Sequence, residues 1–561
     1  MIKQNFFKHK KYYIFIFLLI SFTYVNLVFS YFQQDEWHTF GGYIFKVNEY
    51  GSWQTFINSL TGHLPILHVI SFTNFSLFGV QNLFSFALSF LFIFINIVLW
   101  VRNIEILSQS KMVAYGSVLF GFINFSTSQA ITWTIPSMGY QLTFLFLNLS
   151  FLILLKISKD FTTKYFIYLL LCLLFIYLTR LNAYFFIVLT PFVYLFLKDG
   201  YFSKLNISLF LSLFIIGLLV VYFYLPFGEH RYVPNFLMFI FNIVYIPIKS
   251  LSHILLLDST IIYEWSEYLS TNRFNLFESD RYHQTIVAEN ISAVISLLII
   301  IFASLFFHNF DKKEKGIIKL MLFIYYFSYF GNFFDKHSTG VGLLESRYYY
   351  ISAFFIGVIV FMYINLLIKK INNMTNIFSN IFLYFTYLFL AIYFLVNINI
   401  INQQLLTSND ITNHRKNILQ FIKENHFNQV KNNYILYFKD INLPHAHARN
   451  RTGTMFQTGI LYPLLVYVYD TGKIDYRVFG DDDLFWNINY EGYNTIDDKT
   501  MGIYYSYDKI QKEVNNKKIN VNDVYCMEFD YTAISDNLRV NLFDKVTYED
   551  CTTNFRKQLQ H

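Results

Sequence analysis

The chain has 561 residues, of which 55% are hydrophobic and only 14% are charged, and its formal net charge is +6. This composition excludes a large soluble protein and indicates a membrane protein. The sequence shows no basic patch within a recognisable nucleic-acid-binding fold, so nucleic acid is not an expected partner.

The first predicted membrane helix lies close to the N-terminus. The opening residues "MIKQNFFKHKK" carry four lysines, and a mostly apolar run follows from residue 12 to residue 30. This run is long enough to cross a bilayer, and no small-residue cleavage site follows it. We therefore expect an uncleaved first helix with its N-terminus in the cytoplasm.

Further apolar runs predict about eleven to thirteen membrane helices in total, with 64–80 as a half-embedded helix. The runs are 83–101, 112–130, 140–155, 165–179, 183–197, 205–226, 291–307, 317–334, 348–368 and 377–400. Lysine and arginine are concentrated in alternate connections, as expected for the cytoplasmic side of a membrane protein. These basic connections are 102–111, 156–164, 198–204, 312–319 and 369–370.

This topology leaves three long regions on the outer face of the membrane, at 31–82, 227–290 and 401–561. The last region contains the strand-like runs "NNYILYFKD", "ILYPLLVYVYD" and "IDYRVFG", separated by charged, turn-rich segments. We expect a membrane domain at 1–400 and an extracytoplasmic soluble domain of α+β or β-rich type at 401–561. Outside the cytoplasm, Cys526 and Cys551 are candidates for a disulfide.

The first outer region begins with two adjacent acids, Asp35 and Glu36, directly after the first membrane helix. Glycine turns and amphipathic segments predict two short interfacial helices in this region. Two interpretations of the acids remain open. Either they are solvated residues beside Trp37 and Trp53, which sit in the aromatic belt of the membrane interface, or they form an active site.

Four short motifs after the first helix resemble the GT-C class of membrane-embedded glycosyltransferases, which includes protein O-mannosyltransferases and lipid A aminoarabinose transferases. They are "QDEWH" (34–38), "GSW" (51–53), "GHLP" (62–65) and "LFG" (77–79). The resemblance implies a sugar donor carried by a polyprenyl phosphate at the outer leaflet, and transfer with inversion. It makes Asp35 the general base and Glu36 a group that positions the acceptor. Family members usually show a denser proline pair after the histidine, where this chain has the single Pro65, which leaves the substrate class open.

Arg347 is the candidate for the donor phosphate, because a guanidinium binds phosphate through two parallel hydrogen bonds. It stands in "GLLESRYYYISAFF", which is similar to an Arg-Tyr motif common in GT-C enzymes. Tyr348 would add a hydroxyl group to this site. The alternatives are that Arg347 anchors the helix end or pairs with Glu345, and that Tyr348 belongs to the aromatic belt.

Other candidates have weaker support. His63 either orients a substrate or caps the helix beside Pro65, and Arg180 either serves the site or forms an ion pair between packed helices. The second outer region holds four residues that either cover the lipid head group or are solvated loop residues: His230, Arg231, Arg273 and Arg281.

The C-terminal region contains His445 and His447 in "LPHAHARNRTGT" and three consecutive acids in "GDDDLFW" at 480–486. No carboxylate cluster accompanies the histidines in sequence, and the acids are interpreted as a charged turn rather than a calcium site. We predict no metal site and no organic cofactor, and leave dependence on a divalent cation open.

The sequence thus predicts an inverting glycosyltransferase of the plasma membrane that moves a sugar from a polyprenyl-phosphate carrier to an envelope glycan, lipid or protein. The alternative is a transporter or flippase of lipid-linked saccharides, for which charged or broken helices at mid-membrane are expected. A polymerase of the O-antigen type is a third option, which would rest on arginine-rich outer loops. Nothing in the sequence specifies the sugar or the acceptor.

Overall fold

The computed structural model describes residues 2–29, 34–61, 65–78, 83–132, 134–179, 184–197, 204–224, 236–256, 281–333, 349–373, 377–426, 433–439, 477–480, 500–504, 507–517, 519–534 and 542–560. The chain forms two compact units. The first, here called the helical unit, comprises Met1–Val28, Leu60–Ser71 and Leu83–Gln404. The second, here called the mixed unit, comprises Phe29–Ser59, Phe72–Asn82 and Leu405–His561. The predicted domain boundary near residue 400 stays a prediction.

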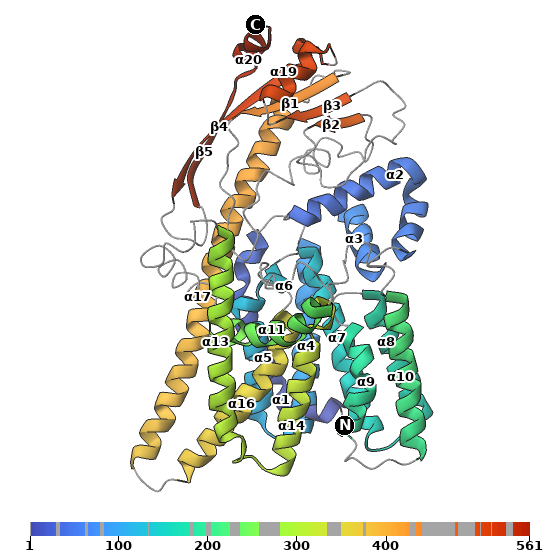
Figure 1. Ribbon diagram of the computed structural model, residues 1–561, viewed down its shortest axis with the longest axis vertical. Helices are drawn as coiled ribbons and strands as arrows, with labels where there is room; N and C mark the ends of the chain where they lie inside the picture. Colours follow the sequence, from blue (N-terminus) through green and yellow to red (C-terminus); the bar gives the residue numbers. More distant parts are fainter. Residues whose placement is uncertain are drawn as a thin grey trace. The chain divides into compact units, whose positions relative to one another are not determined.

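The helical unit is built almost entirely of α-helices (Figure 1). In chain order its elements are α1 (Ile2–Thr23), η1 (Val25–Phe29), α4 (Leu83–Ser108), α5 (Lys111–Phe122), η2 (Phe125–Thr127), α6 (Gln129–Thr132), α7 (Thr134–Ile157), α8 (Thr163–Thr179), α9 (Tyr184–Leu197), α10 (Lys204–Tyr224), α11 (Phe236–Leu255), α13 (Arg281–Phe307), α14 (Lys312–Phe327), α15 (Phe330–Phe333), α16 (Tyr350–Asn372) and, up to Gln404, α17 (Ile377–His426).

Five stretches among the described residues are helical, long and apolar enough to cross a membrane: Leu83–Ser108, Ser137–Ile157, Asn290–Phe307, Tyr350–Asn372 and Ser379–Asn402. Shorter apolar helices accompany them, α8 and α9 included. The fold class expected from the sequence, a polytopic α-helical membrane protein followed by a small domain with a sheet, is thereby confirmed. The number of helices that cross the bilayer stays a prediction.

The region 227–290, expected on the outer face, contains helical structure in two stretches, and its location stays a prediction. Residues 236–255 form the helix α11, and α13 already begins at Arg281. The run "FLMFIFNIVYIPIKSLSHIL" is mostly apolar. Its polar residues recur at helical spacing, so they fall on one side of an otherwise apolar helix. The predicted span at 112–130 is also interrupted, because α5 ends at Phe122 and the side chain of Asn124 caps the short helix η2.

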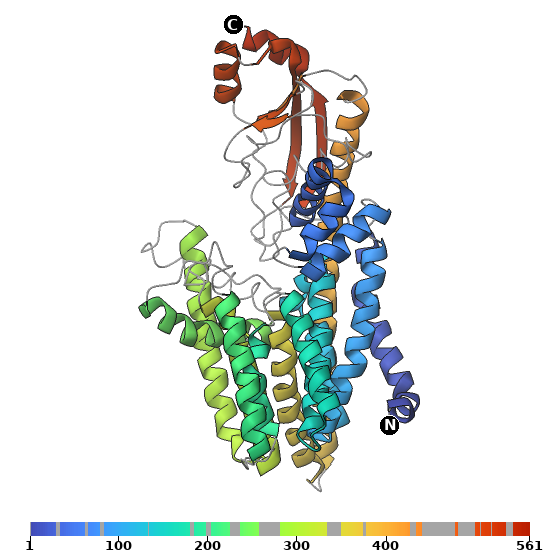
Figure 2. The ribbon, with the colours of Figure 1, turned by 90° about the vertical axis from the view of Figure 1, so that its right-hand side faces the viewer.

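The core of the helical unit lies where α4, α5, α7 and α16 pack together, and Figure 2 shows α16 running between helices on both of its sides. The indole of Trp100 on α4 donates a hydrogen bond to Ser117 Oγ on α5 at 2.9 Å. Its ring also contacts the ring of Phe354 on α16, with the centroids 5.4 Å apart. Gly116 and Gly121 face the rings of Phe361 and Phe354, so a side chain at either glycine would collide with α16.

Buried amides join α4 to α7. Asn96 Nδ2 donates to the backbone oxygen of Gln141 and Asn103 Nδ2 to that of Asn148, both at 2.8 Å. In both pairs the acceptor lies 45 residues after the donor in the chain, so the two helices run parallel. Asn148 Nδ2 also donates to Asn96 Oδ1 at 3.2 Å. Such polar groups hold helices together in a bilayer, where no water competes for them.

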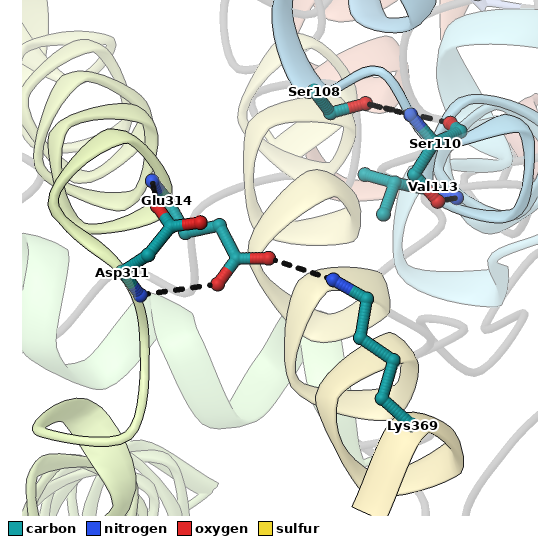
Figure 3. A network of polar contacts seen from close by, with 6 residues as sticks. All are labelled: Ser108, Ser110, Val113, Asp311, Glu314 and Lys369. Atoms are coloured by element: carbon teal, nitrogen blue, oxygen red, sulfur yellow. Dashed lines mark hydrogen bonds and ion pairs between the residues drawn. The ribbon is translucent and has the colours of Figure 1, made fainter. Parts of the chain in front are cut away.

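Two of the basic connections predicted to be cytoplasmic meet at one end of the helical unit. Asp311 caps α14 by accepting a hydrogen bond from the backbone N–H of Glu314, and the backbone N–H of Asp311 donates to the carboxylate of Glu314 (Figure 3). Lys369, near the end of α16, forms an ion pair with Glu314 at 3.0 Å. Lys370 donates to Asn309 Oδ1 at 2.8 Å. Their cytoplasmic location stays a prediction.

The mixed unit contains most of the first outer region. Its helix α2 (Gln34–Thr61) is interrupted at Gly51, whose φ of 78° lies in the left-handed region that glycine tolerates. The expected glycine turn between two helical segments is thus present. Tyr43 of α2 packs edge-on against Phe72 of α3 (Pro65–Phe78) with the centroids 5.3 Å apart. Trp53 is 74% exposed, as expected for a residue of the aromatic belt.

The C-terminal part of the mixed unit is a five-stranded sheet in the order β2-β3-β1-β4-β5. Its elements are β1 (Asn433–Lys439), β2 (Arg477–Gly480), β3 (Thr500–Tyr504), α19 (Tyr507–Asn515), η8 (Val521–Asp523), β4 (Val524–Ile534), β5 (Leu542–Asp550) and α20 (Thr552–Leu559). All neighbouring strands are parallel except β4 and β5. Two of the expected strands are confirmed, and the third, at 460–470, lies outside the described residues.

The predicted disulfide between Cys526 and Cys551 is confirmed, with a Cα–Cα distance of 5.0 Å. It joins β4 to the residue that precedes α20. Phe555 on α20 then stacks on Tyr437 of β1 at a centroid distance of 4.2 Å. The covalent link and the ring contact together hold the last helix on the sheet.

Candidate functional site

The proposed base and its neighbour lie at the start of a helix. Asp35 and Glu36 are in the first turn of α2, which begins at Gln34, and Arg281 is the first residue of α13. The surroundings of these three side chains lie outside what the structure describes. The remaining predicted residues are wholly outside the described ranges: His63, Arg180, His230, Arg231, Arg273, Arg347, Tyr348, His445, His447 and the acids of "GDDDLFW".

The described residues instead reveal a polar interior around α11, which the sequence analysis missed. Asn242, Lys249 and His253 lie on one side of this helix, seven and four residues apart, and all three are 0% exposed. We call these three residues the α11 polar face. The opposite side exposes apolar residues such as Leu237, at 75%, and Val244, at 53%. Figure 1 shows α11 running crosswise to its neighbours α13 and α14.

This arrangement is the reverse of a helix on a water-soluble protein, where the polar side faces outward. A helix with its apolar side outward fits surroundings of hydrocarbon, and its polar side then faces a polar interior. An ionisable residue inside a membrane domain is expensive to bury and marks a functional site by default. Lys249 and His253 are two such residues on one side of one helix.

The side chain of Lys249 lies beside an aromatic ring, and its backbone is tied to α13 through Ser252. Its ammonium is 5.4 Å from the centroid of the Tyr245 ring, a distance at which a cation is attracted to the ring. Its backbone oxygen accepts a hydrogen bond from Ser252 Oγ at 3.2 Å. The backbone nitrogen of Ser252 in turn donates to Ser296 Oγ on α13 at 2.9 Å.

His253 is held from three sides. Its Nδ1 lies 3.4 Å from Ser292 Oγ on α13, and its ring centroid is 5.8 Å from that of Tyr349. Its backbone oxygen accepts a short hydrogen bond from Ser126 Oγ on η2. Asn124 Nδ2 adds a bond to the backbone oxygen of Ile254 at 2.8 Å. Because α5 ends at Phe122, the short helix η2 that follows it lies against the C-terminal end of α11.

Two tyrosines of α14 stabilise α11 at its proline. Pro247 has no N–H, so the backbone oxygen of Ile243, four residues earlier, lacks its helical partner. The hydroxyl of Tyr326 donates to this oxygen at 2.6 Å. The hydroxyl of Tyr325 donates to the oxygen of Pro247, also at 2.6 Å. The proline is thus accommodated, and the residues after it are held against α14.

The polar interior also includes the start of α16. Tyr349 and Tyr350 are 1% and 0% exposed, which places them inside the bundle and not in an aromatic belt. The Tyr349 ring lies between those of His253 and Tyr329, the latter at a centroid distance of 6.5 Å. Both tyrosines directly follow the predicted phosphate-binding pair Arg347-Tyr348 in the chain. The candidate donor motif therefore continues into the interior that the α11 polar face borders.

The sequence did contain a signal for this site. Lys249 and His253 are four residues apart inside a run that is otherwise as apolar as the predicted spans. The alternation of basic connections placed this run within the outer region 227–290, so it was not among the predicted spans. Among the described residues, no group of histidine, cysteine and carboxylate side chains is arranged to hold a metal ion.

Comparison with known proteins adds one likeness. No protein-family model matches the sequence, and none of the curated proteins matches it. Among solved structures, the chain is similar to the crystal structure of ArnT from Cupriavidus metallidurans in the apo state, at 10% sequence identity. The match covers 94% of this chain and 97% of that chain, with a TM-score of 0.30. A score this low does not establish a shared fold, so the function is argued from this chain's own residues.

Proposed function

We propose that the protein is an inverting glycosyltransferase of the GT-C class, which moves a sugar from a polyprenyl-phosphate carrier to an acceptor in the cell envelope. The observation that carries this proposal is the α11 polar face, with Lys249 and His253 fully buried in a membrane unit. The motifs of the first outer region, above all Asp35-Glu36 at the start of α2, supply the second support.

On the donor side, Lys249 and Arg347 are the cations that stabilise the phosphate. A polyprenyl phosphate that leaves a sugar gains negative charge on its oxygens, and fixed cations in a site without bulk water lower the energy of that state. Arg347 precedes the buried Tyr349 by two residues, and Tyr349 contacts His253, four residues after Lys249. The proposal therefore assigns the donor phosphate to cations from two separate segments of the chain, of which Lys249 is the one the structure describes.

On the acceptor side, Asp35 is the general base. A hydroxyl group is a weak nucleophile at neutral pH, and a carboxylate with an ordinary pKa near 4 is ionised there and able to accept its proton. Glu36 is the neighbouring residue on a helix, so its side chain points about 100° away from that of Asp35 and performs a different task. We assign it to orienting the acceptor, together with His63.

The reaction is a single displacement. The acceptor oxygen forms a bond to the anomeric carbon and gives its proton to Asp35, while the bond from that carbon to the phosphate oxygen breaks. The electron pair of the broken bond stays on the polyprenyl phosphate. Attack from the face opposite to the leaving group inverts the anomeric configuration. One carboxylate is sufficient for this step, unlike the paired carboxylates of glycoside hydrolases.

The direction of α16 supports an outer location for this chemistry. Its Lys369 end carries the basic residues predicted to be cytoplasmic, and its Tyr349 end, which borders the polar interior, is the opposite one. By the positive-inside rule that end faces the outer side of the plasma membrane. The disulfide of the mixed unit is consistent with an extracytoplasmic location for that unit.

The first experiment replaces the base. Asp35→Asn removes the proton acceptor and keeps the size of the side chain, so sugar transfer should fall at least about 100-fold. Envelope glycolipids, glycans and glycoproteins from cells that produce each variant are compared by mass spectrometry, at equal amounts of the protein in membranes. Loss of one defined sugar, with its lipid-linked donor accumulating, identifies donor and acceptor together.

Glu49→Gln provides the matched control, because it removes one carboxylate from the same helix α2. This variant should retain the wild-type sugar profile. An unchanged profile in Asp35→Asn cells, where deletion of the gene does remove a sugar, would exclude Asp35 as the base. Glu36, or transport of a lipid-linked saccharide, would then become the leading interpretation.

A further inference from the structure

One row of side chains on α11 leads from the surface of the helical unit to its interior. Its members are four residues apart: Phe241, Tyr245, Lys249 and His253. Side chains at this spacing are neighbours on a helix surface. The exposed fraction falls along the row, from 49% at Phe241 to 0% at Lys249, with Tyr245 half-buried between them. The tyrosine therefore stands where the apolar surface of α11 meets the α11 polar face.

The ring of Tyr245 is held by contacts on two helices. Within α11 the ring of Phe241 stacks on it, with the centroids 4.7 Å apart. The hydroxyl of Tyr245 donates a hydrogen bond to Asn290 Oδ1 on α13 at 2.9 Å. The ring is thus fixed by one neighbour in its own helix and by one in the helix that packs against it.

This ring is a neighbour of the Lys249 ammonium, whose nitrogen lies 5.4 Å from the ring centroid. The face of an aromatic ring carries partial negative charge and attracts a cation, most strongly where both are shielded from water. A ring has no net charge, so unlike a carboxylate it does not neutralise the lysine. The contact therefore restricts the ammonium and preserves its attraction for an anion.

We propose that Tyr245 is a positioning residue for the donor phosphate: its ring holds the ammonium of Lys249 in place, and Asn290 on α13 holds the ring. This inference rests on the role of Lys249 in the proposed function, and adds to it the two residues that preorganise this cation. A lysine side chain loses conformational freedom when it binds a fixed anion. A ring that already restricts the side chain lowers this cost, so Tyr245 strengthens phosphate binding without touching the phosphate.

The test measures how much the phosphate group contributes to lipid binding. The purified full-length protein in lipid nanodiscs is titrated with a fluorescent polyprenyl monophosphate and with the matching polyprenol, which lacks the phosphate. We call the dissociation constant of the polyprenol divided by that of the monophosphate the phosphate preference. Tyr245→Leu removes the ring, so it should lower the phosphate preference about tenfold and leave binding of the polyprenol unchanged.

Two further variants test the hydroxyl group of the tyrosine. Tyr245→Phe keeps the ring and loses the bond to Asn290, so we expect a smaller fall, of about twofold to threefold. Asn290→Leu removes the same bond from the side of α13 and should have the same effect, and the two changes combined should cause no further loss. Equal losses in Tyr245→Phe and Tyr245→Leu would overturn the role assigned to the ring.

Tyr363 of α16 provides the matched control, because it is also half-buried and its hydroxyl also donates to α13, to the backbone oxygen of Ala303 at 2.8 Å. Tyr363→Leu and Tyr363→Phe remove the same atoms from another contact with α13, and both should keep the phosphate preference of the wild type. A loss in Tyr363→Leu as large as that in Tyr245→Leu would overturn the positioning role and leave only a structural one. Equally weakened binding of both lipids to Tyr245→Leu would overturn it too.

Lys249→Met separates this inference from the proposed function. In the Lys249→Met background, Tyr245→Leu should cause no further loss, because the cation that the ring holds is absent, and a further loss would overturn the inference. If Lys249→Met lowers the phosphate preference and Tyr245→Leu does not, the positioning role is wrong and the role proposed for Lys249 stands. If Lys249→Met leaves the phosphate preference unchanged, the role proposed for Lys249 fails, and the positioning role fails with it.

Discussion

Helices α16 and α17 follow one another in the chain and are both apolar enough to cross a membrane, yet they have opposite surroundings. In the most apolar stretch of α16, 61% of the residues are buried inside the protein, against 6% in α17. Figure 1 shows the part of α17 up to Gln404 along the edge of the bundle, and Figure 2 shows α16 between other helices. In a membrane, apolar character alone therefore does not reveal which helix belongs to the core.

The difference lies in the contacts that each helix makes. Phe354 of α16 packs against rings of α4, α5 and α7, and polar residues of α16 bond to α7 and to Ser328, which caps α14. Among the described residues, α17 makes fewer such contacts. Tyr393 stacks on Phe120, the buried Asn397 accepts a hydrogen bond from the backbone nitrogen of Phe125 at 2.9 Å, and Asn402 Oδ1 accepts one from Asn26 Nδ2 at 3.3 Å. Lipid solvates the remaining apolar side chains as well as protein does, so they gain little from burial.

The largest expected effect comes from removing a phenylalanine from each helix. Phe354 on α16 is 0% exposed, and its ring lies 4.3 Å from that of Phe144 between the centroids. Phe354→Ala should reduce the free energy of unfolding by about 3–5 kcal/mol, because it leaves a cavity. Phe389 on α17 is 69% exposed, and Phe389→Ala should change that energy by no more than about 0.5 kcal/mol. Unfolding in mixed detergent micelles measures the stability of both variants. Equal losses of stability would contradict the difference in burial between α16 and α17.

A smaller effect is expected where α5 and α16 cross. A Cβ atom at Gly116 would collide with the ring of Phe361, whereas a Cβ atom at Gly316 on α14 would meet no atom within 4 Å. Gly116→Ala should therefore destabilise the protein by about 1–3 kcal/mol, the usual range for overpacking. Gly316→Ala should stabilise it by up to about 1 kcal/mol, since alanine favours a helix over glycine. The same unfolding experiment measures both variants. Opposite changes in the free energy of unfolding would show that α5 packs closely at Gly116 and that α14 does not at Gly316.

The smallest effect concerns the attachment of α17. Asn397→Leu removes the acceptor of the Phe125 N–H, which should cost about 1–2 kcal/mol and accelerate hydrogen exchange in α17 without changing that in α16. Thr386→Ala is the control, because the hydroxyl of Thr386 donates within its own helix, to the backbone oxygen of Phe382 at 2.9 Å. Exchange that rises equally in α16 and α17 of the Asn397→Leu variant would show that the two helices are not independent.

The candidate site divides in a similar way into what the sequence reveals and what it hides. Asp35 and Arg347 were proposed because they stand in motifs that resemble a known enzyme class. Lys249 and His253 have no such motif, and their importance depends on being 0% exposed. Burial is a property of the neighbours of a residue, which here come from η2, α13, α14 and α16, up to roughly 130 residues away in the chain. No local pattern contains that information.

The sequence by itself determined the class of this protein. The lengths of the apolar runs, the alternation of basic connections, two strands of the sheet and the disulfide between Cys526 and Cys551 follow from short-range rules of hydrophobicity, charge and cysteine placement. Only the tertiary structure decided which side of each helix faces protein. In a bilayer both surroundings are apolar, so that choice is made by close packing at Gly116 and Gly121 and by hydrogen bonds between distant residues, such as that of Tyr350 to Gln141.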